Sequence, residues 1–171
     1  MKLSVKEIAL FGMLGALMFA SKIALEFLPN VHLLGVFTIA MTVVFRRKAL
    51  YPVYVFVFLL GLFYGFPVWW IPHLYLWTVL WGATMLLPKN IPDKWKPIVY
   101  MSLCAVHGFL YGTLYAPSQA LFFGLDFRGT VAWIMAGLPW DAVHGVSNFF
   151  CGVLICPLII ALRRSMKAER E

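Results

Sequence analysis

Residues 31–66 read VHLLGVFTIAMTVVFRRKALYPVYVFVFLLGLFYGF and decide the class of fold. Two apolar stretches, at about 31–45 and 49–66, flank a single basic triplet, Arg46-Arg47-Lys48. Because Lys and Arg in short loops stay on the cytoplasmic side, the triplet predicts an inner turn between two membrane spans. The first stretch is short for a hydrocarbon core of about 30 Å, so tilted neighbours or a locally thin bilayer must accommodate it.

The same pattern of charge extends over the whole chain. Twelve of the fourteen Lys and Arg residues fall in four clusters, and the exceptions are Lys22 and Arg128. Enough apolar sequence separates successive clusters to cross a bilayer and return, so the pattern predicts six transmembrane helices with both termini inside. The clusters consist of Lys2 and Lys6; Arg46, Arg47 and Lys48; Lys89, Lys94 and Lys96; and Arg163, Arg164, Lys167 and Arg170.

The composition supports an all-α integral membrane protein with one domain over residues 1–171. The chain is 63% hydrophobic and 12% charged, with a mean hydropathy of +0.86. A soluble fold of this length could not bury so much apolar surface. The net charge of +7 therefore reflects orientation in the membrane, not a surface for nucleic acid. The three cysteines form no CxxC motif and have no histidine at metal-ligand spacing, so we expect free thiols, no metal site and no cofactor.

The other spans are expected at about 5–28, 73–87 and 97–115. The segment 116–138 is irregular, and we expect part of it to be a short helix at the outer surface. The last span would begin near Pro139, because proline fits the first turn of a helix, and would end near residue 162. The alternative is one long helix from about residue 129 that is kinked at Pro139.

Polar residues stand in two stripes on the last two spans. Asp141, His144 and Asn148 are spaced i, i+3 and i+7, and His107, Tyr111 and Tyr115 are spaced i, i+4 and i+8, so each set shares one helix face. Polar side chains at membrane depth usually face a cavity or a partner, which favours a ligand-binding face. In the alternative, Asp141 caps the start of its own helix and the other two bond neighbouring helices. A cap does not explain Asn148, which lies two turns deeper.

Aromatic residues are concentrated at the predicted outer ends of the spans. They predict a pocket that opens outward, with rings that stack on a flat ligand. In the first outer loop, Asn30 and His32 could form part of a lid. Lys22 and Glu26, spaced i and i+4, are either an ion pair or ligand contacts. The residues that carry these rings are Trp69, Trp70, His73, Tyr75, Trp77, Trp133 and Trp140.

Small residues recur every fourth position on the first span, at Gly12, Ala16, Ala20 and Ala24. Such a ribbon allows a second helix to approach closely. That helix belongs either to this chain or to another membrane subunit. Because the chain contains no GxxxxGK[ST], HExxH or GxSxG motif, we expect no P-loop nucleotide site and no enzymatic activity.

The whole chain resembles the S components of energy-coupling factor transporters. The likeness rests on six spans with both termini inside, on the ribbon of small residues, and on residues 137–148, GLPWDAVHGVSN. It implies that Ala16 and Ala20, extended by Gly12 and Ala24, dock on a membrane coupling subunit that carries two ATPases. It also implies outer loops that act as gates at residues 30–32 and 69–70, and a pocket lined by His107, Tyr111, Trp133, Asp141, His144 and Asn148.

These expectations combine into a substrate-capture subunit that binds a small planar, water-soluble vitamin or similar nutrient. It would lie in the plasma membrane of a bacterium, bind ligand at the extracellular side and deliver it inward. Two alternatives are a redox protein with a haem between His107 and His144, and an intramembrane enzyme that uses Asp141 and His144. The full set of expected ligand-binding residues is Asn30, His32, Trp69, Trp70, His73, His107, Tyr111, Gln119, Trp133, Asp141, His144 and Asn148.

Overall fold

The computed structural model describes residues 3–168, which are helical with short connections and contain no strand. Lys2, Arg170 and the side chain of Lys167, which belong to the predicted terminal basic clusters, lie outside the described residues. The α-helices are α1 (Val5–Ala24), α2 (Leu34–Phe45), α3 (Leu50–Tyr64), α4 (His73–Leu86), α5 (Lys96–Phe109), α6 (Tyr111–Phe123), α7 (Phe127–Cys151) and α8 (Ile155–Ala168). Short 3-10 turns are η1 (Arg46–Ala49), η2 (Val68–Trp70), η3 (Asp93–Trp95) and η4 (Gly152–Leu154).

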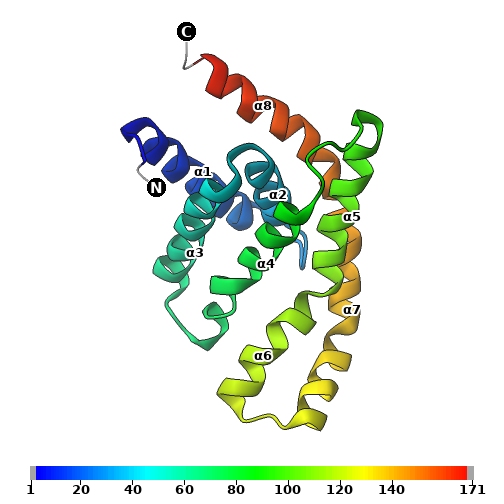
Figure 1. Cartoon of the computed structure of the whole chain (residues 1–171). Helices are drawn as coiled ribbons and strands as arrows, with labels where there is room; N and C mark the ends of the chain where they lie inside the picture. Colours follow the sequence, from blue (N-terminus) through cyan, green and yellow to red (C-terminus); the bar gives the residue numbers. More distant parts are fainter. Residues whose placement is uncertain (1–2, 169–171) are drawn as a thin grey trace.

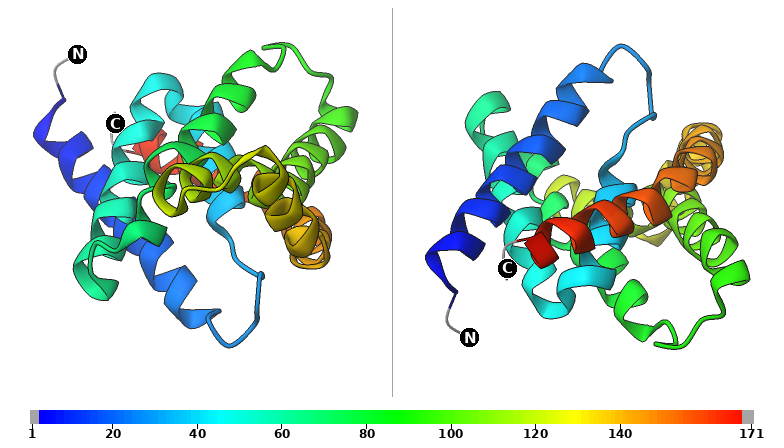
Figure 2. Two further views of the ribbon diagram at one scale, coloured as in Figure 1. Left: turned by 90° about the horizontal axis from the view of Figure 1, so that it is seen from below. Right: turned by 90° about the horizontal axis from the view of Figure 1, so that it is seen from above.

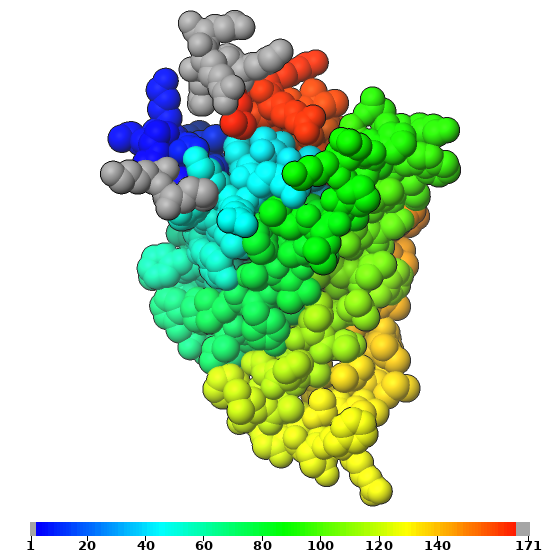
Figure 3. Space-filling model, in the orientation of Figure 1, coloured from blue at the N-terminus to red at the C-terminus, as the bar shows by residue number. Residues whose placement is uncertain are grey.

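The helices form a bundle that is broad at one end and narrow at the other (Figures 1 and 3). α1 packs against α3 on one side and α5 packs against α7 on the other, with α2 and α4 between the two pairs. α8 crosses the broad end, where both termini lie (Figure 2). The turn η1, the α4–α5 connection and α8 all lie at this end, so three of the four basic clusters come together there. The narrow end is formed by α6 and the first half of α7.

Three helical stretches are long and apolar enough to cross a membrane, namely Val5–Ala24, Asp93–Phe123 and Phe127–Met166. The helices α2, α3 and α4 have 12, 15 and 14 residues. At about 1.5 Å per residue they are roughly 18–23 Å long, shorter than a hydrocarbon core of about 30 Å. A membrane protein with an all-helical fold is therefore supported, whereas six crossings and their orientation stay predictions.

The expected start of the last span at Pro139 is wrong, and the alternative of a helix that begins near residue 129 is confirmed at its start. The expected end near residue 162 is wrong, because α7 ends at Cys151 and η4 separates it from α8. α7 begins at Phe127 and continues through Pro139 to Cys151. Its true start is set by Asp126, whose carboxylate accepts a hydrogen bond of 2.7 Å from the N–H of Gly129. An aspartate cap of this kind satisfies a free N–H at the first turn of a helix.

Two other boundaries also differ from the prediction. The first helix ends at Ala24, not near residue 28. The fifth expected span breaks at Leu110, and α6 then continues to Phe123. Gly124 ends α6 with a φ of 65°, the left-handed conformation that glycine adopts without steric cost. The segment 116–138 is therefore mostly helix, and it forms most of α6 and the first half of α7, which reach beyond the rest of the bundle (Figure 1).

The ribbon of small residues takes little part in packing within residues 3–168. Ala16, Ala20 and Ala24 are exposed, and a Cβ added to Gly12 would meet nothing within 4 Å. α1 instead packs on α3 through Gly15, where an added Cβ would lie 2.5 Å from Cγ1 of Val55. The ribbon therefore does not pack against another helix of this chain within residues 3–168, which was the first of its two interpretations.

Candidate functional site

The four histidines of the chain gather at one place, around Trp77 in α4. The ring centroid of Trp77 lies 5.6 Å from that of His107 and 5.8 Å from that of His32. The ring of His73 lies 6.5 Å away, one turn earlier in the same helix. His144 reaches the group through His32, with a centroid distance of 4.5 Å. Four histidines from four separate segments therefore share one environment.

Tyr111 at the start of α6 completes this group. Its ring centroid lies 4.7 Å from that of His144 and 6.1 Å from that of His107. Its hydroxyl lies 3.5 Å from Nε2 of His73. We call the six side chains the histidine cluster, which consists of His32, His73, Trp77, His107, Tyr111 and His144.

A close crossing of α5 and α7 brings two of these histidines together. A Cβ added to Gly108 would lie 2.8 Å from Cα of Gly145 and 2.9 Å from Nδ2 of Asn148. Only glycine at position 108 allows the two backbones to approach this closely. His107 precedes this contact on α5, and His144 precedes it on α7, so both side chains are delivered to the same level of the bundle.

Polar atoms of the cluster are buried without a hydrogen-bond partner among the residues that the structure describes. The Nε2–H of His107 donates one hydrogen bond of 3.1 Å to the carbonyl of Leu76, which leaves its Nδ1 free. Native proteins rarely leave buried polar atoms unpaired, because each costs about 1–3 kcal/mol. The atoms are Nδ1 of His32, His73 and His107, Nε2 of His144 and Nε1 of Trp77; Oδ1 of Asn148, outside the cluster, is also unpaired.

A cavity of about 210 Å³ lies against this cluster. Its walls come from the end of α1, the α1–α2 connection, α4 and the start of α6. Asn30, in that connection, has a φ of 58°, and its carbonyl accepts a hydrogen bond of 2.8 Å from the hydroxyl of Ser147 in α7. The lining residues are Lys22, Leu25, Glu26, Leu28, Pro29, Asn30, Val31, His32, Leu34, His73, Trp77 and Tyr111.

Lys22 and Glu26 are an ion pair in the wall of this cavity. Nζ of Lys22 lies 3.0 Å from a carboxylate oxygen of Glu26, which follows the end of α1. The hydroxyl of Tyr64 donates to both carboxylate oxygens, at 2.7 and 2.8 Å. The hydrogen bond from Tyr64, followed by that from Lys22, lowers the pKa of Glu26, so Glu26 is ionised at neutral pH. In the α1–α2 connection, burial and then the neighbouring His144 lower the pKa of His32, so His32 is neutral.

Asn148 and Asp141 lie on the same face of α7 but do different things. Asn148 is 1% exposed, and its Nδ2 donates to the carbonyl of Cys104 at 3.3 Å. The carboxylate of Asp141 accepts from the N–H of Gly112, at 3.0 and 3.1 Å, and so holds the first turn of α6. The idea that Asp141 caps its own helix is wrong, because α7 begins at Phe127; it caps the neighbouring helix instead.

Other predicted site residues lie outside the cluster. Trp69 is exposed and contacts His73 at 5.8 Å, at the rim of the cluster. Trp70 turns to α3, where its indole N–H donates to the carbonyl of Val57 at 2.8 Å. Trp133 stacks on Tyr115 at 5.9 Å, and Gln119 lines none of the four cavities described.

Trp77, at the centre of the cluster, was expected only as one of many aromatic residues. Its position is readable from the sequence, because Trp77 follows His73 by four residues and must share its helix face. The roles of Lys22 and Glu26 could not be chosen from sequence, since their place in the wall depends on the fold of the connection that follows them.

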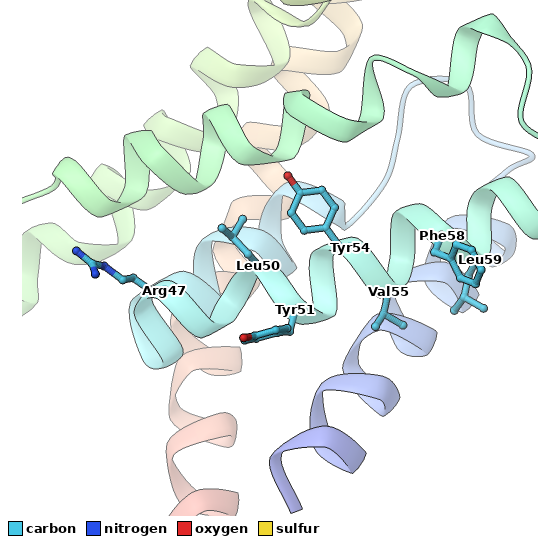
Figure 4. Close-up of a pocket in the computed structure, with 7 residues that line it drawn as sticks. All are labelled: Arg47, Leu50, Tyr51, Tyr54, Val55, Phe58 and Leu59. Atoms are coloured by element: carbon cyan, nitrogen blue, oxygen red, sulfur yellow. The ribbon is translucent and has the colours of Figure 1, made fainter. Parts of the chain in front are cut away.

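The largest of the four cavities, about 550 Å³, is a groove along α3 that contains none of the predicted site residues. Figure 4 shows its side chains on successive turns of the helix, with Tyr54 directed to α4. The Tyr54 hydroxyl donates to the carbonyl of Leu74 at 3.0 Å. A binding pocket needs convergent polar groups, which this mostly apolar surface lacks. We therefore place the candidate site at the histidine cluster.

Within the described range, no group of three or more His, Cys, Asp or Glu side chains is placed to hold a metal ion. The histidine rings meet edge to face, as His32 and His144 do at an interplanar angle of 83°. Comparison of the chain with family models, with curated proteins and with solved structures finds no match.

Proposed function

We propose that this protein is the substrate-binding subunit of a membrane importer, and that it captures a small planar, water-soluble nutrient at the histidine cluster. One observation carries the proposal: His32, His73 and Trp77 line a cavity, His107 and His144 contact them, and each of the five keeps a buried polar atom without a partner among the described residues. A purely structural cluster would pair these atoms with one another.

The shape of the site favours a flat ligand of modest size. Aromatic rings supply large contact surfaces and favour stacked or edge-to-face contact with another ring. The cavity of about 210 Å³ is smaller than the roughly 300–1,000 Å³ typical of pockets for drug-sized molecules. A compound with one or two fused rings suits this space.

The polar atoms define the hydrogen bonds that the ligand would make. The indole N–H of Trp77 can only donate, so the ligand needs an acceptor there. The unpaired Nδ1 atoms of His32 and His73, which line the cavity, accept or donate according to tautomer, so either can pair with a donor on the ligand. The charged wall residues, Lys22 and Glu26, are paired with each other. A heterocycle with both acceptor and N–H groups and no net charge fits this set.

The exposed face of α1 supports the second half of the proposal, delivery through a partner. Gly12, Ala16, Ala20 and Ala24 present a smooth surface that no other part of residues 3–168 covers. Such surfaces suit close packing of two helices in a membrane. We propose that a coupling subunit docks there, as the resemblance to S components implies, and that ATPase subunits provide the energy.

The test begins with the compounds that co-purify with the protein in mild detergent, identified by mass spectrometry. The compound found is then titrated by calorimetry into the wild type, Trp77→Phe and Trp133→Phe. Loss of the indole N–H should weaken binding by about 1–3 kcal/mol, roughly 5- to 150-fold. Trp133→Phe, the matched control outside the cluster, should bind normally. Equal affinity of all three proteins, or no retained compound at all, would refute the proposal.

A further inference from the structure

Two further cavities lie at the broad end of the bundle, where the basic clusters meet. The cavities measure about 320 and 300 Å³ and are bounded by α5, α8 and the segments around η1 and the α4–α5 connection. They share four lining residues, so they adjoin each other. The shared residues are Val43, Lys96, Tyr100 and Arg163.

One of the two compartments is strongly cationic. Arg46, Lys89, Lys96 and Arg163 all line it, and no acidic residue does. Asp93 lines the neighbouring compartment, where its carboxylate lies 2.5 Å from Nζ of Lys96. Four cations therefore face one carboxylate across the two compartments, and this excess of positive charge suits a phosphate group.

Arg46 is held in a conformation that its own sequence does not favour. Its φ is 55° and its ψ is −120°, a region that residues with a Cβ rarely adopt. The backbone carbonyl of Arg46 accepts from the indole N–H of Trp81 at 3.1 Å, and its guanidinium donates to the carbonyl of Met85 at 3.3 Å. Strained backbone that is fixed by its surroundings is typical of sites that must be ready for a ligand.

The other compartment is largely apolar. It is lined by Val43, Pro97, Cys156, Ile159 and Ile160, beside the shared polar residues. Ile160 is 52% exposed, and Ile98, next to Pro97, is 41% exposed. The apolar compartment therefore continues onto an apolar outer surface of the kind that contacts lipid. A free phosphate ion has no apolar part that could occupy this compartment, whereas a phospholipid has one.

We propose that the two compartments together bind one anionic phospholipid. The phosphate headgroup would lie among Arg46, Lys89, Lys96 and Arg163, and the start of an acyl chain would lie against Ile159 and Ile160. Basic pockets between helices at the cytoplasmic surface of membrane proteins bind anionic headgroups in this way. This site is separate from the histidine cluster and does not depend on the identity of the nutrient.

The test uses native mass spectrometry of the full-length protein with phosphatidylglycerol and phosphatidylcholine in equal amounts. The wild type should retain one phosphatidylglycerol molecule in preference to phosphatidylcholine. Lys89→Gln combined with Arg163→Gln removes two exposed cations that line the site. Each is expected to weaken binding about fivefold, so the double variant should bind phosphatidylglycerol about 25-fold more weakly. Cys156→Phe, which fills the apolar compartment and leaves the charge unchanged, should also weaken binding.

The matched control is Lys94→Gln combined with Arg164→Gln. It removes the same charge at the same end, but neither residue lines the two compartments. An equal loss of binding in the control would show attraction by net charge only and would overturn the proposal. Displacement of the lipid by millimolar glycerol phosphate would assign the site to a soluble anion instead. No preference for phosphatidylglycerol in the wild type would also overturn it.

Discussion

Replacement of Gly108 by alanine should separate α5 from α7 and disturb the histidine cluster. The added Cβ would lie 2.8 Å from Cα and 2.9 Å from the backbone nitrogen of Gly145, and backbone atoms cannot turn aside as a flexible side chain can. Overpacking of this kind costs about 1–3 kcal/mol. Alanine regains about 0.8–1 kcal/mol through its higher helix propensity. The net loss of stability is therefore expected to be about 0–2 kcal/mol.

The matched control is Gly137→Ala on α7, where an added Cβ would meet nothing within 4 Å. This variant gains helix propensity without a clash, so the two variants should differ in unfolding free energy by about 1–3 kcal/mol. Unfolding by SDS titration in mixed micelles measures that difference. Gly108→Ala should also bind the co-purified compound more weakly, because His107 and Asn148 adjoin the shifted contact. Equal stability and equal affinity of the two variants would refute the claim that this crossing builds the site.

The remaining predictions concern the cap, the loop and the docking face. Asp141→Ala should cost about 0.5–2 kcal/mol by removing the cap of α6, and hydrogen exchange should rise at the first turn of α6; unchanged exchange there would contradict the role. Burial keeps His32 neutral and lowers its pKa. The contribution of neutral His32 to the free energy of unfolding is therefore complete above about pH 6.5 and is lost as the pH falls. The free energy of unfolding should therefore decrease on acidification, and less so in His32→Gln; a flat stability profile between pH 7.5 and about 5 would contradict this. Ala16→Trp with Ala20→Trp should abolish uptake into cells and leave binding by the isolated subunit intact, and normal uptake would exclude docking at this face.

The sequence predicts which helix faces meet at the site better than it predicts which individual residues belong to the site. Helical spacing alone places His107 and Tyr111 on one face and His144 and Asn148 on another, and the structure brings these faces together. Trp70 and Trp133 share the composition signal of their region, but their direction depends on contacts with residues distant in sequence. Hydrophobic patterning cannot reveal such contacts.

The boundary errors have a different origin. Asp126 and Gly124 are good signals for a helix start and a helix end, and both are present in the sequence. The prediction gave more weight to Pro139, whose position inside α7 shows that a proline does not always mark the first turn of a membrane helix. The expected span lengths also follow from the thickness of the bilayer. The individual helices of a bundle need not match that thickness, because some are shorter and others are longer.

The contact between Ser147 and Asn30 has a consequence for how a molecule reaches the interior. It joins the connection beside the cavity to α7 by a neutral hydrogen bond, worth a net of about 1 kcal/mol, next to the ring contact of His32 with His144. Thermal energy at room temperature is roughly 0.6 kcal/mol, so a hydrogen bond of this strength would break and re-form frequently without an external energy source. Uptake of cargo would then be spontaneous, and its retention would depend on the bonds that the cargo itself makes with the imidazole and indole groups below.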